Sequence, residues 1–191
     1  MADIVLFHHV QGLTTGVRAL ADRLRAAGHT VHAPDLFDGR TFATLDEGMS
    51  HAKSIGFGAL LERGVAEAQS LPAEVVYIGI SMGVMPAQQL VQTRAGARGA
   101  VFIDACLPAE EFGTWPEGVP AQIHGMEADP NFADGGDLDA ARALVASTDA
   151  VELFLYPGDV HLFSDASLPS HDPAATELML RRILEFLAGR G

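Results

Sequence analysis

The segment GISMG places Ser81 where a serine could act as a nucleophile. It directly follows the apolar run VVYIGI (75–80), which is typical of a buried strand, and it opens a helix-like pattern. A sharp strand-to-helix turn leaves no space for side chains two residues on either side of the serine, and Gly79 and Gly83 have none. On such a turn the Ser81 hydroxyl could attack a carbonyl carbon, and the Met82 amide at the helix start could bind the oxyanion. A serine that merely caps the helix is the alternative interpretation.

A serine hydroxyl is a poor nucleophile near neutral pH, so this hypothesis requires a histidine base and an acid that orients it. In hydrolases with this turn, the acid and then the histidine follow the serine along the chain, each at the carboxyl end of a strand. The segment PGDVHLF follows the strand-like run 151–156 and contains His161. Apolar neighbours could bury the surroundings of this residue, and we predict that His161 is the base.

The acid is expected in the loop after the strand-like run 121–124. This loop contains four carboxyl groups, those of Glu127, Asp129, Asp134 and Asp137. Asp129 lies beside Pro130 and close to the strand end, where a short carboxylate is held most firmly, so we predict that it is the acid. The later acids are typical of solvated turns or of a helix cap. A surface acid and a loop histidine are the commoner interpretations of each residue alone, but their joint placement favours catalysis.

The loop after the first strand-like run reads HHVQGLTTG, and a second oxyanion donor is expected there. We predict the backbone amide of Val10 for this role, with His9 lining the site and Gly12 relieving the turn. His8 and His9 could instead bind a metal ion, but no HExxH or comparable ligand spacing accompanies them. The expected chemistry requires neither a metal nor an organic cofactor.

Short apolar runs alternate with helix-period segments along the chain. The strand-like runs are 4–7, 30–33, 75–80, 100–103, 121–124 and 151–156, and the helical segments are 17–24, 57–70, 82–93, 138–147 and 174–188. This alternation indicates an α/β fold with βαβ crossovers, a mostly parallel central sheet with helices on both faces, and a site at the carboxyl ends of the strands. No repeat, low-complexity tract or charge block marks a linker, so we expect one domain spanning residues 1–191.

The composition is that of a globular protein, with 48% hydrophobic and 19% charged residues among 191. There are 25 acidic and 12 basic residues, and the formal net charge of -13 disfavours nucleic acid as a partner. The single cysteine, Cys106, excludes an intrachain disulfide and fits a reducing cytosol. The apolar run 4–7 is too short for a signal peptide or a membrane span, so we expect a cytoplasmic location.

These segments resemble the dienelactone hydrolase family within the α/β-hydrolase fold. The likeness includes FHHVQG after the first strand, APDLFDG at 33–39, the GISMG turn, PAQIHGMEADP at 120–130, YPGDVHLF at 156–163 and the closing helix. The resemblance implies that Ser81 is the nucleophile, Asp129 the acid and His161 the base. It also implies that the oxyanion amides are those of Met82 and Val10.

Two positions depart from the family pattern. Dienelactone hydrolases proper have cysteine where this chain has Ser81, and the glutamate that family members often carry beside the nucleophile aligns with His9. The special activation of a thiol is therefore absent, and the resemblance implies a serine esterase. The chain is also shorter than such enzymes usually are, with little material between Asp38 and the helix at 57–70 to cover a pocket.

The sequence therefore predicts a serine hydrolase that cleaves a small carboxylic ester or lactone through an acyl-enzyme intermediate. A thioesterase or amidase with the same triad is one alternative, and a non-catalytic binding protein of this fold is another. Arg40 could pair with a substrate carboxylate and Trp115 could wall the pocket, although a solvated arginine and a packing aromatic residue are also compatible with the sequence. We expect a monomer or homodimer with a small-molecule substrate and no nucleic-acid or membrane partner.

Overall fold

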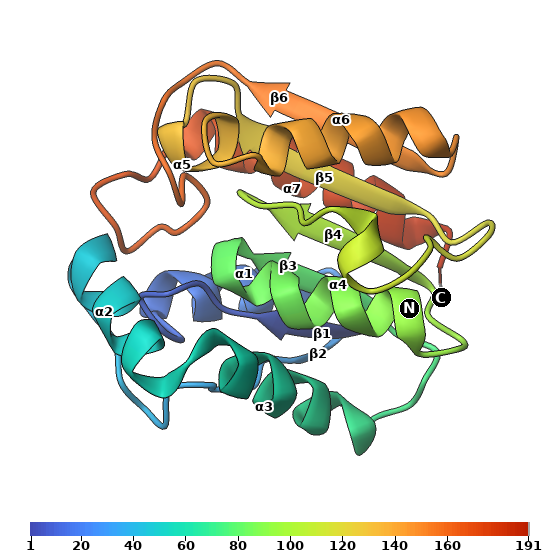
Figure 1. Ribbon diagram of the computed structural model, residues 1–191, viewed down its shortest axis with the longest axis horizontal. Helices are drawn as coiled ribbons and strands as arrows, with labels where there is room; N and C mark the ends of the chain where they lie inside the picture. Colours follow the sequence, from blue (N-terminus) through green and yellow to red (C-terminus); the bar gives the residue numbers. More distant parts are fainter. Residues whose placement is uncertain (191) are drawn as a thin grey trace.

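Six strands form one parallel sheet in the computed structural model, which describes residues 1–190 (Figure 1). Their bounds are β1 Asp3–Phe7, β2 Thr30–His32, β3 Val76–Ile80, β4 Gly99–Ile103, β5 Ala121–Met126 and β6 Val151–Tyr156. They lie side by side in the order β2-β1-β3-β4-β5-β6. Strands β3, β4 and β5 are buried along their whole length, as apolar runs in a sheet covered on both faces should be. The prediction of a mostly parallel sheet is confirmed.

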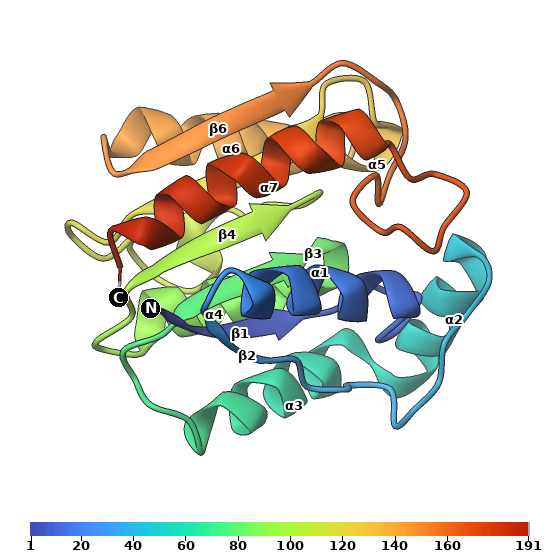
Figure 2. The ribbon, with the colours of Figure 1, turned by 180° about the vertical axis from the view of Figure 1, so that it is seen from behind.

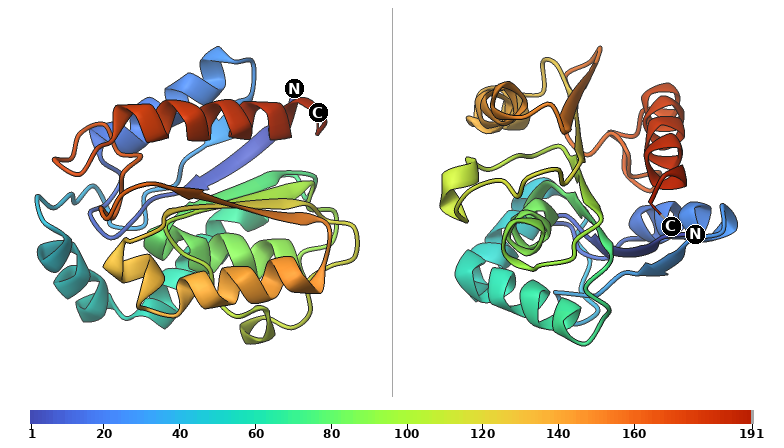
Figure 3. Two further views of the ribbon diagram at one scale, coloured as in Figure 1. Left: turned by 90° about the horizontal axis from the view of Figure 1, so that it is seen from above. Right: turned by 90° about the vertical axis from the view of Figure 1, so that its right-hand side faces the viewer.

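Helices cover both faces of this sheet (Figure 3). Helices α1 and α7 lie on one face, which Figure 2 shows from behind, and α3, α4 and α6 lie on the other. The helices are α1 Thr15–Ala26, α2 Leu45–Ile55, α3 Phe57–Gln69, α4 Val84–Thr93, α5 Pro130–Ala133, α6 Asp137–Ser147 and α7 Pro173–Ala188, with 3-10 turns at Ser81–Gly83 and Ala109–Glu111. Within residues 1–190, no helix is both long and apolar enough to cross a membrane.

Each layer of helices has its own hydrophobic core, and the sheet separates the two. Tyr77 of β3 packs in the core under α3, α4 and α6, whereas the next residue, Ile78, packs in the core under α1 and α7. This alternation arises because successive side chains of a strand point to opposite faces. On α7, Met179 and Ile183 lie one helical turn apart and are both buried against the sheet.

Helix α2 corrects the expectation that little material covers the site. It begins with a capping box, in which the Thr44 side chain accepts from the Glu47 amide and the Glu47 side chain accepts from the Thr44 amide. Within this helix only Gly48 and Ala52 are buried, so no apolar stripe marks it in the sequence. A Cβ on Gly48 would lie 2.2 Å from the Val10 carbonyl oxygen, so α2 packs directly on the loop after β1.

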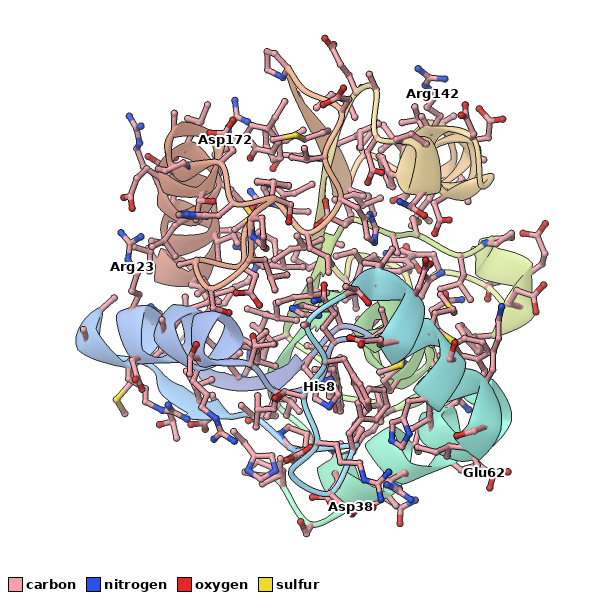
Figure 4. All side chains as sticks on the ribbon, turned by 90° about the vertical axis from the view of Figure 1, so that its left-hand side faces the viewer. His8, Arg23, Asp38, Glu62, Arg142 and Asp172 are labelled. Carbon is pink, nitrogen blue, oxygen red and sulfur yellow. The ribbon has the colours of Figure 1, made fainter. Side chains whose placement is uncertain are left out.

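The carboxyl ends of the parallel strands meet at one edge of the sheet. Figure 4 looks onto this edge, where the labelled His8 follows the end of β1. Helix α2 and the loop 157–172 between β6 and α7 lie at the same end of the molecule (Figure 1). In open α/β sheets, ligands bind at this edge.

Phe132 allows a test of how the segment after β5 is held. Its side chain is fully buried, and a Cβ on Gly125 would lie 2.6 Å from its ring. We predict that Phe132→Ala lowers the free energy of unfolding by about 3–5 kcal/mol, because it leaves a cavity between α5 and the sheet. Urea unfolding measures this change. The exposed change Glu127→Ala in the same segment should stay within about 0.5 kcal/mol of wild type, and an equally small effect of Phe132→Ala would contradict this packing.

Candidate active site

The turn between β3 and α4, here called the elbow, presents Ser81 at the carboxyl edge of the sheet. Ser81 has a φ of 49°, in the left-handed region where a residue other than glycine is strained. A Cβ on Gly79 would lie 2.4 Å from the Gly83 carbonyl oxygen, and a Cβ on Gly83 would lie 2.4 Å from the Phe7 carbonyl oxygen. Only residues without side chains fit at both positions, so the two glycines permit the corner and its contact with the end of β1.

Hydrogen bonds join Ser81, His161 and Asp129 in series. Ser81 Oγ lies 2.9 Å from His161 Nε2, and His161 Nδ1 lies 2.6 Å from Asp129 Oδ2. An ionised carboxylate can only accept, so Nδ1 carries the proton and Nε2 of the neutral ring accepts from the Ser81 hydroxyl. This tautomer can take a proton from Ser81. The residues follow β3, β6 and β5, whose carboxyl ends the parallel sheet brings to one edge.

Acids around His161 favour its protonated form. Burial alone lowers the pKa of His161, but the hydrogen bond to Asp129 raises it. The charges of Asp104, Asp129 and Asp137 act in the same direction, and the pKa of His161 lies above its ordinary value of 6.5. Burial also raises the pKa of Asp129, yet its bonds to His161 and Asn131 bring that pKa below its ordinary value. Asp129 therefore stays ionised and can stabilise an imidazolium on His161.

Asp129 is fixed as the N-cap of α5. Its Oδ1 accepts from the Asn131 backbone N–H at 2.9 Å, which leaves Oδ2 for His161. Of the alternative acids, Glu127 and Asp134 are exposed. The third alternative, Asp137, is half-buried, and its Oδ1 accepts from the Cys106 backbone N–H at 2.8 Å. Among these four carboxyl groups, the hydrogen bond to His161 belongs to Asp129.

The loop after β1 lies beside the elbow. Val10 from this loop and Met82 from the elbow line the same cavity as Ser81. Gly12 has a φ of 91°, and its N–H donates to the His9 carbonyl oxygen at 3.0 Å, which closes the turn of this loop. Both residues predicted to supply oxyanion amides are therefore close to Ser81, as binding of a single oxyanion requires.

His9 does not line this cavity. Its side chain is fully buried, its Nε2 donates to Asp165 Oδ2 at 2.8 Å, and its Nδ1 accepts from the Gln11 amide at 3.2 Å. The Thr14 hydroxyl donates to the same oxygen of Asp165. Burial raises the pKa of Asp165, but its hydrogen bonds lower it to about 2. His9 therefore ties the loop after β1 to the loop after β6. No sequence pattern predicts this pair, because its members lie 156 positions apart.

A cavity of about 310 Å³ opens beside Ser81. Its apolar lining consists of Val10, Leu45, Met49, Met82, Met85, Ala105 and Leu107. Its polar lining consists of Ser81, Asp104, Asn131, Asp137 and His161. Over the described chain, this lining includes no lysine or arginine. A mostly apolar cavity of this size fits a small organic molecule.

Arg40 and Trp115 lie outside this lining. The Arg40 side chain is exposed, and its backbone carbonyl oxygen packs so closely on Gly12 that a Cβ there would be 2.3 Å away. The indole N–H of Trp115 donates to the Val119 carbonyl oxygen at 2.8 Å, and its ring packs edge to face on Phe102. The cavity therefore gives no support to the substrate contacts predicted for these two side chains.

Asp104, Asp129 and His161 form a group in which three potential metal-ligand atoms lie within 4.8 Å of one another. Both ring nitrogens of His161 are already hydrogen-bonded, one to Ser81 and the other to Asp129. These bonds suit a nucleophile, base and acid better than a metal centre. Asp104 was missed by the sequence interpretation, because its only signal is its position directly after a buried strand.

Glycine substitutions test the close contact at the elbow. We predict that Gly83→Ala destabilises the protein by about 1–3 kcal/mol, because the methyl group would overlap backbone oxygens after β1. It should also slow the modification of Ser81 by a fluorophosphonate by roughly 10-fold or more, since the Ser81 hydroxyl is displaced from His161. Gly58→Ala is the matched control, because it adds a methyl group to a helix at a position with open space. If both variants behave alike in urea unfolding and in labelling, the close contact is contradicted.

Comparisons with known proteins place this chain in a family. The model of the dienelactone hydrolase family matches residues 2–190. Among curated proteins, no sequence matches the chain.

Several solved structures share the fold. A Klebsiella pneumoniae protein described as a candidate dienelactone hydrolase superposes with a TM-score of 0.76 at 14% identity, covering 98% of this chain and 87% of that one. A dienelactone hydrolase-like promiscuous phosphotriesterase from metagenomic libraries superposes with a TM-score of 0.76 at 18% identity, covering 100% of this chain and 87% of that one. Thermogutta terrifontis esterase 2, phosphonylated by cyclosarin, superposes with a TM-score of 0.73 at 17% identity, covering 100% of this chain and 83% of that one. Because the family match extends over nearly the whole chain, this protein belongs to the dienelactone hydrolase family and is a hydrolase of ester bonds.

Proposed function

We propose that this protein is a serine hydrolase that cleaves a small carboxylic ester or lactone through an acyl-enzyme intermediate. The observation that carries the proposal is the hydrogen-bonded series from Ser81 through His161 to Asp129. This series supplies a nucleophile, a base in the required tautomer and a buried acid. The small, mostly apolar cavity beside Ser81 supports a compact acyl group as its occupant.

In the first half of the reaction, Ser81 Oγ attacks the ester carbonyl carbon while His161 Nε2 takes the hydroxyl proton. The carbonyl oxygen becomes an oxyanion, which the amides of Met82 and Val10 bind. The bond to the leaving oxygen then breaks, and His161 gives its proton to the departing alcohol. The acyl group is now esterified to Ser81. With a lactone, the released hydroxyl stays on the acyl chain.

In the second half, His161 takes a proton from a water molecule as the water oxygen attacks the acyl carbon. The same amides bind the second oxyanion. When the bond to Ser81 Oγ breaks, His161 returns the proton to the serine and the carboxylic acid leaves. Asp129 stays ionised throughout and holds the imidazole in the productive tautomer. None of these steps requires a metal or an organic cofactor.

Leaving-group preference separates this function from its closest alternatives. A thioesterase or an amidase would use the same acyl-enzyme chemistry, so the triad alone does not distinguish them. Membership of a family of ester-bond hydrolases favours the ester. The excess of acidic residues and the single cysteine further support a small-molecule substrate and a cytoplasmic location, and we expect a monomer or homodimer.

Organophosphorus reagents are suitable probes of this nucleophile. One structural neighbour is described as a phosphotriesterase, and Thermogutta terrifontis esterase 2 is phosphorylated by paraoxon. We predict that a fluorophosphonate modifies wild-type protein at Ser81 and leaves Ser81→Ala unmodified, because His161 activates this hydroxyl alone. Intact mass and peptide mapping measure the modification. Ser54→Ala, an exposed serine of α2, is the control and should label like wild type. The proposal would be contradicted if the wild-type protein is not labelled, or if Ser81→Ala is labelled equally well.

The cavity lining predicts discrimination against anionic esters. In the described part of the chain it includes Asp104 and Asp137 but no lysine or arginine, so a substrate carboxylate would be buried beside acids without a permanently charged partner. We predict that kcat/KM for monomethyl malonate is at least about 10-fold lower than for methyl butanoate, an uncharged ester of similar size. Acid release in a pH-stat measures both rates. A preference for the malonate that is lost in Arg40→Gln would instead assign a substrate carboxylate to Arg40.

A further inference from the structure

Asp104 is a buried carboxyl group that the mechanism above does not use. It directly follows β4 and is 1% exposed. Among residues 1–190, neither of its carboxyl oxygens has a hydrogen-bond partner of normal geometry, although burial of an unpaired polar group costs free energy. Its backbone has a φ of 60°, in the left-handed region, and its N–H donates to the His124 carbonyl oxygen at 2.8 Å. A strained residue with an unpaired buried acid points to a functional role.

This carboxyl group lies beside the proposed base and acid. An oxygen of Asp104, an oxygen of Asp129 and a ring nitrogen of His161 lie within 4.8 Å of one another. The strand order explains this proximity, because β4 lies between β3, which leads to Ser81, and β5, which leads to Asp129. Asp104 is therefore on the correct edge of the sheet to act on His161 without touching it.

The charged groups around His161 are acids from three elements. Asp104 follows β4, Asp129 caps α5 and Asp137 begins α6. The carboxyl group of Asp137 accepts a hydrogen bond from the Cys106 amide, and that of Asp129 accepts one from His161. The cavity lining offers no lysine or arginine in the described chain to offset these acids. His161 is thus the group that can carry a compensating positive charge.

Ionisation of Asp104 and protonation of His161 favour each other. Burial raises the pKa of Asp104 to about 7, while the charge of His161 lowers it and that of Asp129 raises it. The nearby Leu162 backbone N–H, which lies outside normal hydrogen-bond geometry, also lowers it. In return, the negative charge of Asp104 raises the pKa of His161. The carboxylates of Asp104 and Asp129 repel each other, and a positive charge on His161 offsets this repulsion. Asp104 therefore ionises most easily when His161 is an imidazolium, which is the state formed during acyl transfer.

We propose that Asp104 is a second acid for His161, a positioning residue that stabilises the imidazolium through charge and partly replaces Asp129 when that carboxylate is removed. The proposal rests on the proposed function, since the imidazolium forms during turnover only if His161 is the base. Asp129 remains the hydrogen-bonded acid that sets the tautomer. Asp104 adds negative charge from the end of β4, the strand beside β5 that leads to Asp129. It exchanges no proton with substrate.

Asparagine variants test this proposal, because asparagine keeps the size of aspartate and tolerates a left-handed φ. We predict that Asp104→Asn lowers kcat by about 3- to 10-fold with KM within about twofold of wild type. The acid limb of kcat/KM should move to lower pH, because loss of the negative charge lowers the pKa of His161. Asp129→Asn should lose more activity, yet remain at least about 10-fold more active than the double variant Asp104→Asn/Asp129→Asn.

A titration that does not depend on activity separates this proposal from the proposed function. The pKa of His161 is measured from its ring signals by NMR, with the signal assigned by its loss in His161→Gln. It should be lower in Asp104→Asn than in wild type. Asp38→Asn is the matched control, because Asp38 also has a left-handed φ of 53° but is exposed and pairs with Arg63. This control should keep the wild-type titration and rates.

An unchanged His161 titration in Asp104→Asn would overturn the proposal whatever the activities are. So would a double variant that is as active as Asp129→Asn alone. Urea unfolding of each variant shows that the comparison is made between folded proteins. If wild type turns over no ester and does not label with a fluorophosphonate, the proposed function fails, while the titration still decides whether Asp104 acts on His161.

Discussion

The site depends on one steric constraint, the backbone contact between the elbow and the end of β1. Gly83 lies against the Phe7 carbonyl oxygen, so the loop that follows β1 must start beside Ser81. Helix α2 makes a similar contact on the other side of this loop, where Gly48 lies against the Val10 carbonyl oxygen. The proposed nucleophile Ser81, the loop after β1 and helix α2 thus pack on one another through backbone contacts. Donors fixed in this way need no rearrangement when charge develops, which is the basis of electrostatic stabilisation of a transition state.

Two hydrogen-bonded pairs of histidine and aspartate hold the loop after β6 against this arrangement. His161 bonds Asp129, and Asp165, four positions further along the same loop, bonds His9. The loop after β6 therefore carries the proposed base and also the residue that anchors the loop after β1. The two pairs differ in their task. His161 is partly exposed and reaches Ser81, whereas His9 is fully buried and bonded on both ring nitrogens. The second pair can hold geometry but cannot exchange a proton with a substrate.

The sequence predicted those parts of the fold that depend on local patterns. Apolar runs indicated all six strands. The glycines around Ser81 indicated a tight turn, because the residues that must lack side chains there are close to Ser81 in the sequence. The order of serine, acid and histidine pointed to the loops after two strands, and the position of Asp129 beside Pro130 near a strand end favoured it over three other acids; the structure joins Asp129 to His161 by a hydrogen bond. Membership of the family and the parallel sheet agree with the predicted family and fold class.

Other features depend on contacts between segments that are distant in the sequence, and no local pattern predicts them. Helix α2 was missed because its buried face consists of Gly48 and Ala52, although Thr44 and Glu47 form a capping box that is readable in the sequence. The role of Asp165 depends on His9, at the other end of the chain. Asp104 becomes notable only when its burial and its missing hydrogen bonds are known.

Trapping the acyl-enzyme tests the central claim most directly. Wild-type protein is mixed with p-nitrophenyl butanoate, an activated ester that favours rapid acylation, and is quenched in acid before many turnovers. The account predicts a burst of p-nitrophenol equal to the enzyme concentration, with one butanoyl group that peptide mapping assigns to Ser81. Turnover of the ester with no adduct, or with the adduct on a residue other than Ser81, would contradict it.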